Sequence, residues 1–126
     1  MSRSHEIEAV VVAFNGCINR RDLTGLATLM TDDHVFIDSG GATHRGKATM
    51  KGQWKQFFAS FPDYRNHFEV IVSDGNRVAV AGHSTCSVQA LHGPALWSAR
   101  VSNGLVVEWR VYHDTEANRR LLGLPA

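Results

Sequence analysis

The stretch Leu105-Val-Val-Glu-Trp-Arg-Val-Tyr-His-Asp114 decides how the fold of this chain is read. β-Branched and aromatic residues dominate it, so it predicts one long β-strand. Successive side chains of a strand point to opposite faces. One face would carry Leu105, Val107, Trp109, Val111 and His113, and the other Val106, Glu108, Arg110, Tyr112 and Asp114. Either the polar face lines a pocket, or the apolar face packs on helices and Asp114 lies in water.

Three more strands are predicted before this one, over Tyr64–Ser73, Arg77–Gln89 and Ala95–Ser102. Asn103-Gly104 joins the last of them to Leu105, and Asn-Gly between apolar alternating runs is a strong hairpin signal. Asp74-Gly-Asn76 and Leu91-His-Gly-Pro94 separate the others. A closing helix follows over Glu116–Leu122, with Thr115 as its cap and Gly123 as its stop.

The first half of the chain shows helical spacing instead. Ile7, Val10, Val11, Phe14 and Ile18 recur at this spacing, and a short second helix follows Asp22. His34–Asp38 is a predicted strand, Gly40–Gly46 a loop, and Met50 to Phe61 a third helix that Pro62 ends. The order predicts a single α+β domain over residues 1–126, with helices on one face of a curved antiparallel sheet.

Composition excludes several classes of partner. The formal net charge of +1 gives no reason to expect nucleic acid or a membrane surface. Cys17 and Cys86 have no CxxC spacing, and free thiols in the cytoplasm are the simplest interpretation. The seven histidines show no helical ligand spacing, and no phosphate-binding loop is present, so we expect neither a metal nor a cofactor.

The sequence resembles the nuclear transport factor 2-like superfamily, in its SnoaL-like and ketosteroid isomerase-like branch. The resemblance extends over nearly the whole chain and is carried by Phe61-Pro-Asp63, Asn76-Arg-Val-Ala-Val80, Trp109-Arg-Val-Tyr-His-Asp114 and Leu121-Leu-Gly123. It implies a cone-shaped fold in which a curved sheet wraps around a helix hairpin and a third helix. It also implies a pocket between them and a homodimer formed through the sheet.

The same resemblance suggests catalytic residues. Asp114 matches the acid/base carboxylate of SnoaL-type cyclases and of limonene epoxide hydrolase, and Asp38 stands where a first-strand acid approaches the pocket mouth. Two positions depart from the relatives. Gly82 and Ser84 replace the arginine and aspartate that epoxide hydrolases need, and Phe14 stands in place of the tyrosine of a ketosteroid isomerase oxyanion hole.

We therefore expect Asp114 to move a proton, with Tyr112 and Arg110 holding a developing enolate oxygen and Asp38 as a second carboxylate. Simpler roles remain open for both acids. Asp114 can cap the closing helix or pair with Arg110, and Asp38 before Ser-Gly-Gly can be a turn former.

Bulky helix residues opposite small sheet residues predict a cavity. Phe14, Phe36, Trp54 and Phe58 would form its apolar wall, and Ser84 and Ser98 would leave room on the sheet. The alternative is that these aromatic residues fill the core. The sequence thus predicts a cofactor-independent isomerase or cyclase acting on a small apolar carbonyl compound. The other possibility is a non-catalytic ligand-binding or dimerisation module on the same fold.

Overall fold

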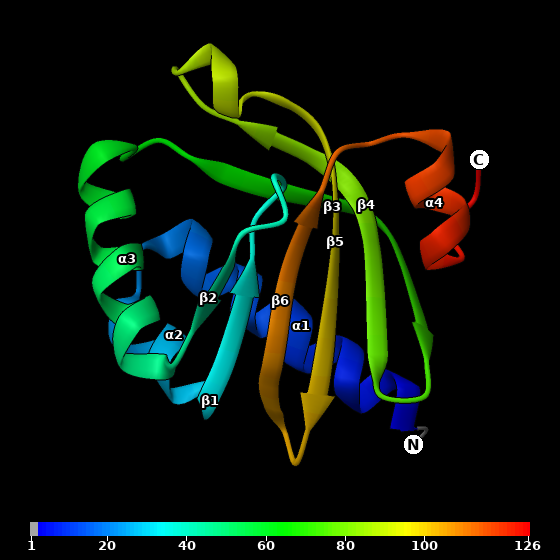
Figure 1. Ribbon diagram of the computed structural model, residues 1–126, viewed down its shortest axis with the longest axis horizontal. Coiled ribbons are helices and arrows are strands. Elements are labelled where there is room, and N and C mark those ends of the chain that lie inside the picture. Colours follow the sequence, from blue (N-terminus) through cyan, green and yellow to red (C-terminus); the bar gives the residue numbers. More distant parts are fainter. Residues whose placement is uncertain (1–2) are drawn as a thin grey trace.

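The computed structural model describes residues 3–126, which form a curved sheet with helices on both faces (Figure 1). The elements along the chain are α1 (Arg3–Arg20), α2 (Leu23–Thr28), β1 (Met30–Ile37), β2 (Thr43–Arg45), α3 (Lys47–Ser60), β3 (Arg65–Asp74), β4 (Arg77–Thr85), a 3₁₀ turn η1 (Gln89–Leu91), β5 (Gly93–Ser102), β6 (Leu105–Tyr112) and α4 (Glu116–Leu122). The predicted α+β architecture is confirmed.

The sheet has six strands in the order β2-β1-β6-β5-β4-β3. The four strands from β3 to β6 form the predicted antiparallel meander, but β1 pairs with β6 in parallel, so the sheet is mixed rather than antiparallel throughout. The segment predicted as a loop also contains the short strand β2, which pairs with β1 as an edge.

Local capping signals behave as the sequence predicts. The Asp22 carboxylate accepts the backbone N–H of Gly25 at the start of α2, and the Thr115 hydroxyl accepts that of Asn118 at the start of α4. The turn between β5 and β6 places Asn103 and Gly104 at φ 53° and 76°. Both angles are positive, as a tight hairpin turn of this kind requires.

Two apolar layers lie on the two faces of the sheet. The inner face packs on α1 and α3 and contributes Val78, Val80, Trp97, Ala99 and Trp109 to the main core. The outer face carries a smaller cluster in which α4 and the C-terminal segment cover part of the sheet, formed by Ala79, Ala81, Leu96, Tyr112, Leu122 and Leu124. The two sets alternate along β4 and β5, as side chains of a regular pleated strand do.

A β-bulge in β6 changes the face on which its residues lie. Val101 pairs with Val106 but Arg100 pairs with Glu108, so Val107 is an extra residue on that strand. Val106 and Trp109 are consequently both buried in the main core. The strict alternation predicted for Leu105–Asp114 is therefore wrong.

The sheet face that carries Trp109 and Val111 packs on the inner core, so it offers no uncovered apolar surface for the predicted sheet-to-sheet dimer. Part of the opposite face is covered by α4 of the same chain. The oligomeric state therefore stays a prediction.

Candidate functional site

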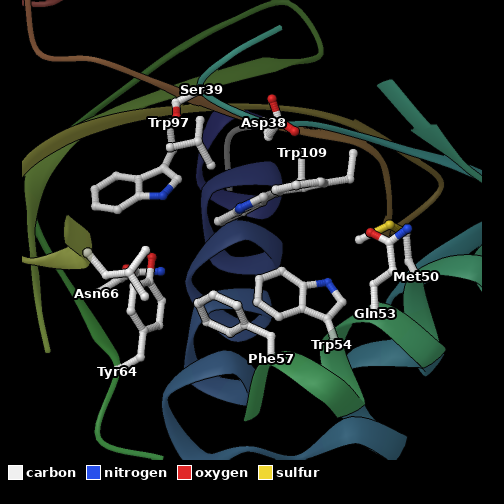
Figure 2. Close-up of a pocket in the computed structure, with 13 residues that line it drawn as sticks. Asp38, Ser39, Met50, Gln53, Trp54, Phe57, Tyr64, Asn66, Trp97 and Trp109 are labelled. Carbon is white, nitrogen blue, oxygen red and sulfur yellow. The ribbon is translucent and has the colours of Figure 1, made fainter. Parts of the chain in front are cut away.

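A cavity of about 280 Å³ lies between α3 and the inner face of the sheet (Figure 2). Aromatic and aliphatic side chains make most of its wall, and polar groups gather at two places. It is lined by Phe36, Asp38, Ser39, Met50, Gln53, Trp54, Phe57, Tyr64, Asn66, Leu91, Trp97, Trp109 and Val111. A cavity of this size and composition matches a small, mostly apolar organic molecule.

Helix α3 supplies one wall through residues on a single face. Met50, Trp54 and Phe57 recur at helical spacing, so their side chains point to the sheet together. The Trp54 ring meets Phe57 edge-on at 5.6 Å and Phe36 of β1 at 6.0 Å. Trp54 and Phe36 thus lie on the wall predicted for them. Their role in binding a ligand stays a prediction.

Phe14 and Phe58 lie behind the wall rather than on it. Phe14 of α1 is fully buried. Its ring packs in a tilted arrangement against Trp109, which itself lines the cavity, with the ring centroids 4.6 Å apart. The ring of Phe58 contacts that of Trp54, with the two ring centroids 5.6 Å apart. The prediction that these two rings face the cavity is therefore wrong, because larger indoles stand between them and the space.

Trp97 of β5 and Trp109 of β6 form the opposite wall. In the register of the two strands Trp97 pairs with Val111 and Trp109 with Ala99, so the two indoles are diagonal neighbours on the inner face. Phe68 of β3 contacts Trp97 at 5.2 Å and supports it from the core side. Figure 2 shows the indoles above the cavity, with Trp54 and Phe57 below it.

One polar corner of the cavity is formed by Tyr64 and Asn66. The Ser84 hydroxyl donates to Asn66 Oδ1 at 2.8 Å, so its oxygen is free to accept the Tyr64 hydroxyl at 3.3 Å. Burial raises the pKa of Tyr64 above its ordinary value, although hydrogen bonds with Ser84 and Asn66 oppose the shift. Tyr64 is therefore a neutral phenol at physiological pH.

Ser84 contributes to this corner from behind. It is buried and holds Asn66 and Tyr64, but it is not among the residues that line the main cavity. The prediction that Ser84 lies on the cavity wall is therefore wrong, because Tyr64 and Asn66 lie between it and the cavity. Gly82, two residues earlier, leaves no room for a side chain, because a Cβ there would stand 2.0 Å from the His67 carbonyl oxygen.

Helix α1 anchors the polar corner to the core. Asn19 exchanges two hydrogen bonds with the Asn66 backbone, donating to its carbonyl at 2.9 Å and accepting its N–H at 2.8 Å. Asn15 donates to the same carbonyl at 3.3 Å. Arg21 donates to the Tyr64 carbonyl at 2.8 Å. These bonds fix the start of β3, and with it the two polar residues of the cavity.

The second polar group lies where β1 ends. The Asp38 carboxylate accepts the backbone N–H groups of Gly40 and Ala42, both at 3.0 Å, and His44 Nε2–H at 3.1 Å. These hydrogen bonds, the one from His44 first, lower the pKa of Asp38. Gln53 donates its amide to His44 Nδ1 at 3.3 Å. Asp38 is thus both the turn former and an ionised group on the cavity wall.

Arg110, Tyr112 and Ser98 lie on the other side of the sheet. The Tyr112 hydroxyl shares a 2.9 Å hydrogen bond with Ser98 in the outer cluster, and the Arg110 guanidinium lies over the Tyr112 ring at 4.7 Å. The prediction that these three residues line the pocket is wrong. The inner face buries Trp109 and Val111 instead, and alternation then sends their neighbours outward.

Asp114 follows the end of β6 and is bound by α4. Arg119 donates to both carboxylate oxygens, Nε to Oδ1 at 2.6 Å and Nη2 to Oδ2 at 2.9 Å. The hydrogen bonds from Arg119 lower the pKa of Asp114, whereas a proton-shuttling carboxyl needs a raised pKa. The predicted position of Asp114 in the cavity is therefore wrong, and its partner is Arg119 rather than Arg110.

Tyr64, Asn66 and Trp97 are among the lining residues that the sequence did not reveal. Tyr64 and Asn66 stand at the start of a strand whose inward face depends on contacts with α1. Trp97 is assigned to the inner face only once the β6 bulge sets its pairing with Val111 rather than Arg110. The Asn103-Gly104 turn predicts the hairpin between β5 and β6, but it does not predict the bulge in β6.

Three further findings concern metal ligands, membrane-spanning helices and cysteines. Among residues 3–126 no cluster of three or more histidine, cysteine, aspartate or glutamate side chains is placed to hold a metal ion. No helix in the described part of the chain is long and apolar enough to cross a membrane. Both cysteines, Cys17 and Cys86, are free thiols.

Solved structures share this fold at low sequence identity. An LEH-like epoxide hydrolase from M. tuberculosis superposes with a TM-score of 0.79 at 19% identity, covering 90% of this chain and 86% of its own. A candidate polyketide cyclase from Sinorhizobium meliloti gives 0.74 at 16%, covering 82% and 93%. An NTF2-like protein of unknown function from Burkholderia pseudomallei gives 0.74 at 20%, covering 97% and 98%. Identities this low establish a common fold but do not establish a common activity.

The sequence comparison is more specific about family than about activity. The comparison with curated proteins found no match. The family model of the SnoaL-like domain matches residues 11–120, which includes most of α1, the whole sheet and part of α4. The chain therefore belongs to the SnoaL-like domain family, with the nuclear transport factor 2-like fold that the sequence predicts.

Proposed function

We propose that this protein binds a small, flat, mostly apolar molecule in the cavity between α3 and the sheet. The observation that carries the proposal is the cavity itself, about 280 Å³ in volume and enclosed largely by aromatic side chains. The aromatic stripe of α3 does not fill the core completely, which was the alternative left open by the sequence. The volume is near the lower end for small-molecule sites, so it suits a molecule of one to three rings.

The wall also favours a flat ligand. Trp54 and Phe57 on α3 stand opposite Trp97 and Trp109 on the sheet (Figure 2). Aromatic rings pack against one another in offset or edge-to-face geometry with favourable energy beyond simple burial. A planar ring inserted between the two walls would make such contacts on both of its faces.

Binding can be tested through the protein's own fluorescence, because all three tryptophans line the cavity. We expect bound 1-indanone to change the emission in a saturable manner. Val111→Phe places a larger side chain on the cavity wall and should weaken binding at least tenfold. The matched control is Val88→Phe on an exposed loop residue, which should bind as the wild type does. Equal affinity in both variants would exclude the cavity as the binding site.

Acid–base chemistry at Asp38 is a second candidate function. Asp38 is the only carboxylic acid among the lining residues, and His44 holds its carboxylate in place. Its low pKa makes it a weak base, which favours binding as the first function. The test is exchange of the protons next to the indanone carbonyl for deuterium. If Asp38 is a base, Asp38→Asn slows this exchange by about 100-fold or more, whereas equal rates exclude it.

A further inference from the structure

The Trp97 indole carries a buried N–H donor that has no partner in the described protein. Trp97 is 1% exposed, and its Nε1 makes no hydrogen bond within residues 3–126. A buried donor left unsatisfied costs roughly 1–3 kcal/mol, so nearly all such groups in folded proteins are bonded. In Figure 2 this nitrogen lies on the edge of the indole that faces Trp109 and the cavity.

The other polar groups at the polar corner satisfy one another. Ser84 donates to Asn66 Oδ1, and its oxygen is placed to accept the Tyr64 hydroxyl. The Asn66 backbone is bonded to Asn19. Trp97 stands on the same cavity wall without any such arrangement. Its buried donor therefore lies unpaired beside the cavity.

Charge on the cavity wall limits what that group can be. The lining residues include no lysine, arginine or histidine, and their one carboxylic acid is Asp38, whose pKa is lowered. An anionic ligand would meet an ionised carboxylate and no balancing cation in an apolar space, which is unfavourable. A neutral acceptor oxygen, such as that of a ketone, quinone or ester, meets neither obstacle.

We infer that Trp97 is a specificity-determining residue that donates its indole N–H to a neutral carbonyl oxygen of the bound molecule. The inference rests on the proposed function and names the chemical class of the ligand. Apolar contacts with Trp54 and Phe57 bind the ring system, and the Trp97 N–H selects the ring system that carries oxygen. A hydrocarbon of the same shape binds more weakly, because it leaves this donor unsatisfied.

The test compares 1-indanone with indane, which has the same rings but no oxygen. In the wild type the indole N–H resonance of Trp97 should move downfield with indanone and not with indane. Trp97→Phe keeps an aromatic ring and removes the donor. It should weaken indanone binding about three- to tenfold and change indane binding less than twofold. The ratio of the two affinities therefore falls in this variant.

Trp54→Phe is the matched control, because it removes an indole from the α3 wall. It should lower the affinity for both probes by the same factor and leave their ratio unchanged. If indanone and indane bind the wild type with equal affinity, or Trp97→Phe keeps the wild-type ratio, the inference about Trp97 is wrong and the cavity remains a binding site. If neither probe binds the wild type, the proposed function fails as well. The wild-type resonance shift tests the donor even if Trp97→Phe does not fold.

Discussion

Arg119 holds Asp114 through two parallel hydrogen bonds, with Nε 2.6 Å from Oδ1 and Nη2 2.9 Å from Oδ2. This pair joins the end of β6 to α4, at residues outside those that line the cavity. A bidentate arginine–carboxylate pair fixes geometry more strongly than a single bond does. The residue that the family resemblance suggested as an acid/base group therefore stabilises the packing of α4.

Replacing Asp114 should affect stability without affecting binding. In Asp114→Asn we expect the thermal midpoint at pH 7 to fall by a few degrees and the affinity for 1-indanone to stay unchanged. The lowered pKa of Asp114 means that the pair contributes fully above the ordinary aspartate pKa of about 3.9. Its contribution is lost as pH falls through the lower folded-state pKa. The difference between variant and wild type should therefore shrink with acidification.

Glu116→Gln provides the comparison for this pair. Glu116 bonds Arg120 at 3.1 Å on the same helix, but both side chains are more than three-quarters exposed. Exposed ion pairs of this kind contribute little to stability, so this variant should have the same thermal midpoint as the wild type. If Asp114→Asn instead lowers the affinity for indanone and leaves stability unchanged, Asp114 takes part in binding.

Buried His34 should make the protein less stable in mild acid. Its Nδ1–H donates to the Val106 carbonyl at 2.8 Å, while Nε2 is buried without a partner in the described chain. Burial lowers the pKa of His34, so the folded state keeps the ring neutral. Above about pH 6.5 the ring is neutral in both states. Below that pH only the unfolded state gains a proton, and stability falls by at most about 1.4 kcal/mol at pH 5.5.

Denaturant unfolding at pH 7.5 and pH 5.5 measures this effect. His34→Asn keeps a donor for Val106 but has no titratable ring, so its stability should differ less between the two pH values than that of the wild type. His113→Asn changes an exposed histidine and should retain the wild-type difference. The same loss in His34→Asn as in the wild type would mean that other groups cause it.

The elements of the fold could be predicted from the sequence because their signals are local. Apolar spacing gave the helices, and Thr115 and Gly123 bound α4 as capping chemistry requires. The Asn103-Gly104 turn gave the β5–β6 hairpin. Each signal depends on residues that are neighbours in the chain, so no knowledge of tertiary contacts was needed.

The bulge at Val107 could not be predicted, and the site depends on it. The extra residue lets Val106 and Trp109 both reach the core, a choice made by packing against α1 and not by the strand's own sequence. Beyond the bulge Val111 points inward together with Trp109 and Tyr112 points outward, which is the second of the two arrangements that the sequence left open. Sequence patterns found Trp54 on α3 and Phe36 on β1 as wall residues, but missed Trp97 on β5.

The anchor between α1 and β3 should matter for binding as well as for stability. Asn19→Ala removes both hydrogen bonds to the Asn66 backbone. We expect a loss of about 1–3 kcal/mol, because the Asn66 N–H loses its partner and the carbonyl keeps only the longer, 3.3 Å bond from Asn15. Asn66 and Tyr64 should then be held less firmly, and indanone affinity should fall several-fold.

Asn118→Ala is the control for this effect. Asn118 donates to the His113 carbonyl at 2.9 Å near α4, outside the set of lining residues, so its loss should leave indanone affinity unchanged. Denaturant unfolding gives the stability of both variants, and tryptophan fluorescence gives their affinity. Wild-type affinity in Asn19→Ala would show that the polar corner keeps its position without the anchor.

Two glycine-to-alanine changes should have opposite effects on stability. At Gly82 an added Cβ would stand 2.0 Å from the His67 carbonyl oxygen on the neighbouring strand, beside the bulge in β3. The contact is with backbone, so the sheet itself must move. We expect Gly82→Ala to lose about 3 kcal/mol or more. The same close approach explains why this position cannot carry the arginine of an epoxide hydrolase.

Gly52 in the interior of α3 offers the opposite case. Apart from its chain neighbours and the surrounding backbone of α3, no atom lies within 4 Å of the position where its Cβ would be, and the residue is exposed. Gly52→Ala should therefore raise stability by about 0.5–1 kcal/mol, the usual difference between the two residues in a helix. Denaturant unfolding of the two variants side by side checks both signs. A small loss of stability in Gly82→Ala would mean that β3 and β4 approach less closely in solution. The close approach would then not explain the bulge beside them.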